Sequence, residues 1–126
     1  MRFLSNKNVL VAGGTGLIGI HLVELLIERG AKVRIASLDD PSRAHPEAEF
    51  MRTDLTDYQN CLKISKGIDY VFNLLCAKGS PLMMANYPAT FFDTLRKLSS
   101  NLAEAALKNN VGGYLFASSV AVYHPA

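Results

Sequence analysis

Cysteine is scarce in this sequence, and clusters of basic residues and long apolar runs are absent. The two cysteines, Cys61 and Cys76, stand fifteen positions apart without a CxxC pair or a nearby histidine pattern. We therefore expect neither a metal site nor a disulfide framework, and we expect a cytoplasmic location. The net charge of +2 argues against a nucleic-acid surface. The most apolar stretch, residues 9–27, is interrupted by four glycines, His21 and Glu24, which argues against a membrane span.

What is present is a regular alternation of short apolar runs and helical patterns. The 126 residues, 49% hydrophobic and 19% charged, suit one globular domain that covers residues 1–126. Strands are predicted at residues 9–12, 32–37, 49–52, 69–75 and 114–118. This order predicts an α/β fold with a parallel sheet of about five strands flanked by helices on both faces and joined by right-handed crossovers. Ligands of such sheets bind beyond the carboxyl ends of the strands.

Two helices have a clear apolar stripe. Residues 17–29 place Ile18, Leu22, Leu25 and Leu26 on one face, with Gly30 as the C-terminal cap. The longer one is predicted to begin at a capping box at residues 90–93 and to end at Gly112 and Gly113, and its stripe is Phe91, Leu95, Leu98, Leu102 and Ala105 or Ala106. A third helix is predicted from a capping box at residues 56–59 to Gly67, and residues 77–89 are predicted to form a loop.

A glycine-rich turn joins the first predicted strand to the first predicted helix. It contains GxGxxG and GxxGxxG, and its residues are Gly13, Gly14, Thr15, Gly16, Leu17, Ile18 and Gly19. Glycines here permit a tight turn, a close approach of the backbone to a pyrophosphate, and close packing of helix on strand. The following helix N-terminus attracts phosphate. Because strand and helix flank the motif as a dinucleotide site requires, we predict that the turn binds NAD or NADP.

Four segments spread over the chain resemble the extended short-chain dehydrogenase/reductase family, in particular its NAD(P)-dependent nucleotide-sugar epimerases and dehydratases. They are the glycine turn with Ala12, the Asp-Leu-Thr-Asp segment at 54–57, the Asp-Tyr-Val-Phe-Asn-Leu segment at 69–74, and the Ser-Ser-Val-Ala-Val-Tyr segment at 118–123. The resemblance implies a Rossmann-type fold that stops after its fifth strand, with the substrate-binding part absent. The partners it implies are a nucleotide cofactor and, in a longer form, a sugar nucleotide.

The resemblance also implies roles for individual residues. Asp54 and Leu55 would meet the adenine ring, and the nicotinamide side would be lined by Leu74, Leu75, Cys76 and Ala77. Ser119 would be the catalytic serine that hydrogen-bonds the reacting oxygen. Its alternative role is that of an ordinary serine at the end of a strand, and the neighbouring Val122 and Tyr123 favour the catalytic role by about two to one, by analogy.

Three departures from the family concern the cofactor site. Ala12 and Asn73 stand where the family usually has Thr and His, and Ser37 stands where it usually has the Asp that holds the adenosine ribose. A small serine leaves room for the 2′-phosphate of NADP, with Arg34 or Arg43 to pair with it. Asp39 and Asp40 follow at once, however. Either could reach the ribose hydroxyls, and both would repel a phosphate. The balance leans slightly to NADP.

The family's acid/base pair, Tyr-x-x-x-Lys, is absent, because none of the five tyrosines has a lysine four residues later. We therefore expect the chain to be the cofactor-binding portion of an epimerase or dehydratase and to be at best a trace catalyst alone. The alternatives are a non-catalytic NAD(P) sensor or regulatory module, or an NmrA-like NADP-binding protein, whose relatives generally lack the SSxxVY stretch. An apolar edge at the fifth strand, or a helix, predicts a homo-oligomer.

Overall fold

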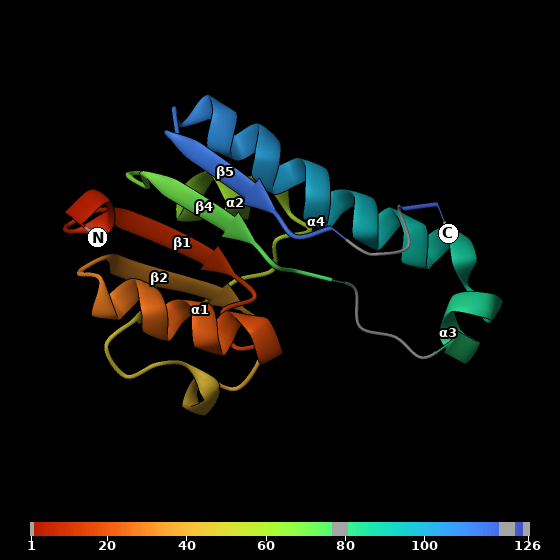
Figure 1. The fold of residues 1–126 in the computed structure, drawn as a ribbon. Coiled ribbons are helices and arrows are strands. Elements are labelled where there is room, and N and C mark those ends of the chain that lie inside the picture. The colour runs from red at the N-terminus through yellow and green to blue at the C-terminus, as the bar shows by residue number, and fades with distance from the viewer. Residues whose placement is uncertain (1, 77–80, 119–122, 125–126) are drawn as a thin grey trace.

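The computed structural model describes residues 2–76, 81–118 and 123–124 (Figure 1). Its helices and strands follow one another in the predicted alternation. In chain order they are the short 3-10 helix η1 (Arg2–Leu4), β1 (Asn8–Ala12), α1 (Leu17–Glu28), β2 (Lys32–Ser37), the 3-10 helix η2 (Pro41–Arg43), β3 (Glu49–Arg52), α2 (Tyr58–Ile64), β4 (Tyr70–Asn73), α3 (Pro81–Asn86), α4 (Pro88–Lys108) and β5 (Gly113–Phe116).

The five strands form one parallel sheet in the order β3-β2-β1-β4-β5, which confirms the predicted fold class. β1 lies at its centre, and Val11 is paired with Ile35 of β2 on one side and with Phe72 of β4 on the other. From β1 the chain builds outward to β3, then returns and continues on the opposite side at β4. The carboxyl ends of β1 and β4 therefore flank the point where the strand order reverses, which is where sheets of this kind bind ligands.

Successive side chains of β1 enter two separate cores, because residues of a strand alternate between the faces of a sheet. Leu10 and Ala12 belong to the core beneath α2 and α4. Val9 and Val11 belong to the core beneath α1. Figure 1 shows α1 on one face of the sheet and α2 and α4 on the other. β1 is thus buried on both faces, as its continuous apolar run predicted.

The buried face of α1 differs from the prediction. Its buried residues are Gly19, Val23 and Leu26, whereas Ile18 and Leu25 are 67% and 47% exposed. A Cβ on Gly19 would overlap the carbonyl oxygen of Gly13 and lie 2.8 Å from the Cα of Gly14. Close contact of the turn with Gly19 therefore sets the rotation of the helix, and positions four and seven residues later follow it into the core.

The ends of two helices also differ from the sequence expectations. The N-cap of α2 is Asp57, whose side chain accepts a hydrogen bond from the Gln59 N–H, and not Thr56. The predicted loop contains α3, and α4 begins at Pro88, before the predicted capping box. The left-handed residue that ends α4 is Asn110, at φ 55°, in place of a glycine. An asparagine tolerates this conformation because its short polar side chain bonds locally.

The other expected boundaries agree closely with the structure. Gly30, at φ +84°, ends α1 as predicted, and its N–H bonds the Ile27 carbonyl while Ala31 N–H bonds that of Leu26. β2 and β3 have the predicted bounds. β4 and β5 are each shorter than predicted and end at Asn73 and Phe116. The shortening of β4 releases Leu74 to Cys76 from the sheet at its ligand-binding edge.

Candidate functional site

A cleft of about 390 Å³ opens at the carboxyl ends of β1 to β4. Eight of the residues that the sequence singled out as cofactor contacts line it together: Gly13, Gly16, Ser37, Asp54, Leu55, Leu74, Leu75 and Cys76. They come from three loops and from the end of β2, which the parallel topology brings to one edge. Six further residues complete the lining: Leu38, Asp39, Thr53, Thr56, Thr94 and Leu98.

The glycines of the turn have different reasons to be glycine. Gly13 has φ +84°, and a Cβ there would lie 3.2 Å from the backbone of Leu74. A Cβ on Gly14 would lie 2.9 Å from the Ile35 side chain in the core. Gly16 is the exception, because a Cβ there would meet only the Gly13 oxygen, at 3.4 Å. Gly16 lines the cleft, so its missing side chain leaves open space at the site and does not serve internal packing.

The N-terminus of α1 has no side chain to cap it. Its N-cap is Gly16, which makes no side-chain hydrogen bond, and the first-turn amides of a helix have no partner within the helix. Leu17 and Ile18 point outward and are exposed. The first turn of α1 therefore carries a partial positive charge beside the cleft, where an anion is stabilised.

Three side chains connect the glycine turn to the end of β2. Thr15 donates its hydroxyl proton to Asp39 Oδ2 at 2.7 Å and lies 2.8 Å from Ser37 Oγ. The Asp39 N–H donates to Ser37 Oγ at 3.0 Å. Since Thr15 has a single proton and gives it to Asp39, Ser37 must donate to Thr15. Thr15 and Ser37 are buried, and together the three groups hold the Asp39 carboxylate at the wall of the cleft.

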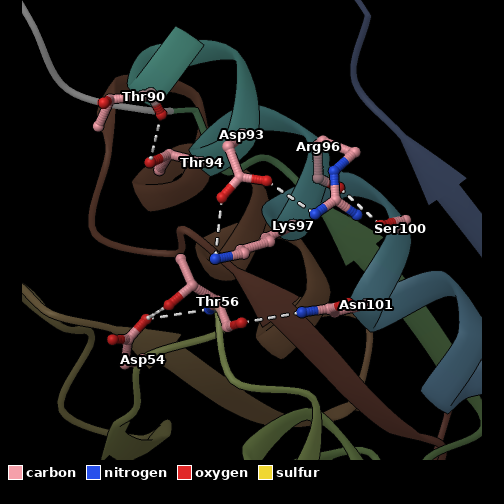
Figure 2. A network of polar contacts seen from close by, with 9 residues as sticks. All are labelled: Asp54, Thr56, Thr90, Asp93, Thr94, Arg96, Lys97, Ser100 and Asn101. Carbon is pink, nitrogen blue, oxygen red and sulfur yellow. Dashed lines mark hydrogen bonds and ion pairs between the residues drawn. The ribbon is translucent and has the colours of Figure 1, made fainter. Parts of the chain in front are cut away.

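The loop after β3 supplies the opposite wall, which Figure 2 shows with its contacts to α4. Asp54 accepts hydrogen bonds from the Thr56 hydroxyl at 2.7 Å and from the Thr56 N–H at 3.0 Å. These two bonds hold the pKa of Asp54 below its usual value, so its carboxylate is ionised at neutral pH. The Asn101 amide donates to the Thr56 carbonyl at 2.9 Å. The loop after β3 is therefore anchored to α4.

Figure 2 also shows two ion pairs on α4. Asp93 pairs with Lys97 at 2.9 Å and with Arg96 at 2.7 Å. Hydrogen bonds first from Lys97 and then from Arg96 lower the pKa of Asp93. These exposed pairs at helical spacing contribute little to stability. The positive charge of Lys97 also lowers the pKa of Asp54, so this end of α4 favours a carboxylate in the cleft.

The loop after β4 is held by one buried amide. Asn73 donates to the Leu98 carbonyl at 3.0 Å and to the Tyr114 hydroxyl at 2.9 Å, and its Oδ1 accepts the Leu75 N–H at 3.1 Å. Asn73 thus connects β4 to α4 and β5 and directs Leu74 and Leu75 along the cleft. The sequence marked Asn73 only as a departure from its family, because hydrogen bonds between distant elements leave no local pattern.

The remaining predicted site residues lie elsewhere. Gly14, Thr15, Leu17, Ile18 and Gly19 lie in the turn or at the start of α1 but do not line the cleft. Ala77 and Ser119 lie outside the described residues. Of the lining residues that the sequence did not mark as cofactor contacts, Thr94 and Leu98 stand four positions apart on α4. Their helical spacing is the one available signal, and it indicates a shared face without saying what that face lines.

Three further observations concern metal binding, the reactivity of a thiol, and the membrane. Within the described ranges, no group of three or more His, Cys, Asp or Glu side chains is arranged to hold a metal ion. Cys61 is fully buried, and burial raises the pKa of its thiol to about 11, which makes it unreactive. In the part of the chain that the structure describes, no helix combines the length and apolarity needed to cross a membrane.

The cleft fits the adenosine and pyrophosphate parts of a dinucleotide. The phosphates require backbone space, which Gly16 supplies, and unpaired N–H groups, which the first turn of α1 supplies. Asp54 and Asp39 line the same cleft and offer carboxylate oxygens as hydrogen-bond acceptors. A parallel 3-2-1-4-5 sheet with this cleft at its switch point defines a dinucleotide-binding fold of the Rossmann type.

The chain belongs to the NAD dependent epimerase/dehydratase family, whose model matches residues 9–126. The cofactor of this family is a nicotinamide dinucleotide. The GDP-mannose 3,5-epimerase of Arabidopsis thaliana is 32% identical over 94% of this chain and 32% of its own length. A 3 beta-hydroxysteroid dehydrogenase/Delta 5-->4-isomerase of Mycobacterium tuberculosis is 33% identical over 90% of this chain and 32% of its own length. The family resemblance seen in the sequence is confirmed.

Solved structures are also similar to this chain. The UDP-glucose 4-epimerase of Thermotoga maritima with UDP-glucose has a TM-score of 0.79 and 30% identity, over 90% of this chain and 38% of its own. The Bordetella bronchiseptica enzyme WbmF in complex with NAD+ has a TM-score of 0.76 and 25% identity, over 92% of this chain and 37% of its own. The chain therefore spans about a third of these curated relatives and two-fifths of these structures.

Proposed function

We propose that this chain binds the nicotinamide dinucleotide of an oxidoreductase that epimerises or dehydrates a nucleotide sugar. The observation that carries the proposal is the cleft that brings Gly16, Asp54 and Leu74 together at the switch point of the sheet. The nucleotide-sugar part is supported by the epimerases among the relatives and structures. A hydroxysteroid dehydrogenase among the relatives shows that the family includes other reactions as well.

We further propose that the 126 residues by themselves catalyse at most traces of such a reaction. They contain no tyrosine followed four residues later by lysine, and a positioned acid/base contributes about 10²–10⁴-fold to a rate. Ser119, assigned to the reacting oxygen by resemblance, remains a proposal. A hydride-transfer assay of the wild type and Ser119→Ala tests both statements. A turnover rate typical of an enzyme, about 1–10³ per second, would contradict the first, and an unchanged residual rate in Ser119→Ala would contradict the second.

The binding proposal has a matched pair of variants. A methyl group on Gly16 enters the open cleft, whereas one on Gly19 collides with the backbone of the turn. Gly16→Ala should therefore lower NADH affinity by about tenfold or more at unchanged unfolding midpoint. Gly19→Ala should destabilise the fold by about 1–3 kcal/mol. Reduced-nicotinamide fluorescence and thermal unfolding measure the two effects, and wild-type NADH affinity in Gly16→Ala would contradict the assigned site.

We also propose that the chain forms a homo-oligomer through β5. In the described residues β5 pairs only with β4, and Figure 1 shows it at the edge of the sheet. Its Leu115 is half exposed, and such apolar edges pair with another chain. Sizing at rising concentration should show a dimer that Leu115→Lys dissociates, while Leu107→Lys, a control on the exposed surface of α4, leaves it intact. A monomer at every concentration would contradict the proposal.

A further inference from the structure

Two walls of the cleft come from different elements and share one hydrogen-bonding side chain. Leu75, from the loop after β4, and Leu98, from α4, both line the cleft. The completely buried side chain of Asn73 accepts the Leu75 N–H at 3.1 Å and donates to the Leu98 carbonyl at 3.0 Å. The orientation of this amide therefore fixes the loop after β4 relative to α4.

The orientation of the Asn73 amide depends on its partners, because the terminal torsion of an asparagine has a broad energy minimum. A carbonyl oxygen can only accept, so Nδ2 must face Leu98 and Oδ1 must face the Leu75 N–H. A second hydrogen on Nδ2 remains, and it lies in a side chain that is completely buried. The Tyr114 hydroxyl accepts this hydrogen at 2.9 Å. Tyr114 is thus the third contact that holds the amide in place.

Tyr114 reaches the amide from outside the cleft. It lies on β5, and none of the four residues of β5, all of which the structure describes, lines the cleft. Burial is the main cause that raises the pKa of the Tyr114 phenol above its usual value, so the hydroxyl is neutral at physiological pH. A group on the exposed edge strand therefore takes part in holding two walls of a cleft that this strand does not touch.

We propose that Tyr114 is a positioning residue for the cleft, whose hydroxyl acts through Asn73 to set the separation of the two walls and thereby the affinity for the dinucleotide. The proposal rests on the proposed function, since it takes a nicotinamide dinucleotide to be the ligand of the cleft. It gives β5 a part in cofactor binding that is separate from its proposed part in self-association.

Tyr114→Phe removes the hydroxyl and leaves the ring. One Nδ2 hydrogen of Asn73 then lacks its acceptor in a buried place, which is costly and favours rotation of the amide toward other partners. The Leu75 N–H loses its acceptor whenever the amide rotates. The neighbouring Leu74 N–H keeps its own acceptor, because it bonds the backbone carbonyl of Ala12 at 2.9 Å. These two amides form an internal comparison that needs no ligand.

Hydrogen exchange followed by NMR on isotope-labelled protein measures both amides. In Tyr114→Phe we expect exchange at Leu75 to accelerate by about fivefold or more and exchange at Leu74 to change by less than about twofold. Tyr58→Phe is the matched control, because Tyr58 packs against the core beneath α2 and α4, as Leu98 does, and does not line the cleft. It should change neither amide by more than about twofold.

Binding of NADH, followed by nicotinamide fluorescence, tests the consequence for the cleft. Tyr114→Phe should lower the affinity by about three- to tenfold, and Tyr58→Phe should lower it by less than about twofold. In an Asn73→Ala background Tyr114→Phe should lower the affinity no further, because the hydroxyl acts through the amide. Size-exclusion chromatography at the concentration of the titration checks that each variant has the oligomeric state of the wild type.

The contradicting results are distinct. Wild-type exchange at Leu75 in Tyr114→Phe overturns the proposal without reference to any ligand. Unchanged NADH affinity in Tyr114→Phe, or an equal loss in Tyr58→Phe, also overturns it. A further loss from Tyr114→Phe in a folded Asn73→Ala background, checked by circular dichroism, shows that Tyr114 does not act through Asn73. Failure of the wild type to bind any dinucleotide at millimolar concentration contradicts the proposed function and the effect on affinity, whereas exchange at Leu75 still decides whether Tyr114 holds the amide.

Discussion

β1 and β5 are short apolar strands of the same sheet, yet their environments are opposite. The last four residues of β1 are completely buried, whereas Tyr114, Leu115 and Phe116 of β5 are 36%, 50% and 45% exposed. β1 lies between two strands and beneath helices on each face, and β5 has β4 as its one paired strand among the described residues. Burial therefore follows from the neighbours of a strand and not from its own composition.

The difference matters for the proposed function because the cleft lies at the carboxyl ends of the buried strands. Gly13 continues from β1, and its position is fixed by the backbone of Leu74 after β4. The close-packed strands β2, β1 and β4 thus hold the cleft residues. The exposed strand β5 supports the cleft only indirectly, through the hydrogen bond between Tyr114 and Asn73.

The largest expected effect comes from truncating one leucine in each strand. Leu10→Ala removes a fully buried side chain from the core beneath α2 and α4 and should cost about 2–5 kcal/mol of unfolding free energy. Leu115→Ala removes a half-exposed side chain and should cost less than about 1 kcal/mol. Urea unfolding followed by circular dichroism measures both. Similar losses would show that β5 is covered in solution.

A smaller effect is expected where the two regions are joined. Asn73→Ala leaves the Leu98 carbonyl, the Tyr114 hydroxyl and the Leu75 N–H without their shared partner, which should cost about 1–3 kcal/mol. It should also weaken NADH binding, because Leu75 lines the cleft. Asn8→Ala removes an exposed amide bonded to the Gly67 carbonyl and serves as the control. Equal stability of the two variants would contradict the linking role of Asn73.

The smallest effect concerns the pH dependence of the core beside β1. Burial first, and then the charges of Asp57 and Asp54, raise the pKa of Cys61 from 9.0 to about 11. The unfolded thiol therefore ionises at lower pH than the folded one, and stability present below pH 9 is lost as the pH rises toward 11. Between these values the wild type should lose about 1 kcal/mol per pH unit more than Cys61→Ala. Parallel curves for the two proteins would exclude this contribution.

Much of the fold was predictable because local patterns determine it. The glycine turn, β2, β3 and the Gly30 cap are short-range features, and each has its expected place. The buried face of α1 was predicted only in part. Leu26 is buried as expected, but Ile18 and Leu25 are exposed, because the face depends on the contact of Gly19 with the turn and not on which residues are most apolar. The C-terminal end of α4 was missed because asparagine took the place expected of glycine.

Most residues that line the candidate site could be predicted from the sequence, but the side-chain hydrogen bonds between them could not. Eight of the residues marked in the sequence line one cleft, because parallel topology brings strand ends to one edge. The hydrogen bonds among Thr15, Ser37 and Asp39 were not predictable, since they depend on how the loop after β2 folds back. The same holds for Asn101, which reaches the Thr56 carbonyl from α4. Such side-chain contacts join residues far apart in sequence and have no periodic signal.

The most direct test of the account is the affinity of the 126-residue chain for NADH, measured by fluorescence in the wild type and in Gly16→Ala. The cleft at the switch point predicts binding by the wild type and a loss of about tenfold or more in Gly16→Ala, with unchanged thermal stability. Failure of the wild type to bind NADH, NAD, NADPH or NADP at millimolar concentration would contradict the central claim that this cleft is a dinucleotide site.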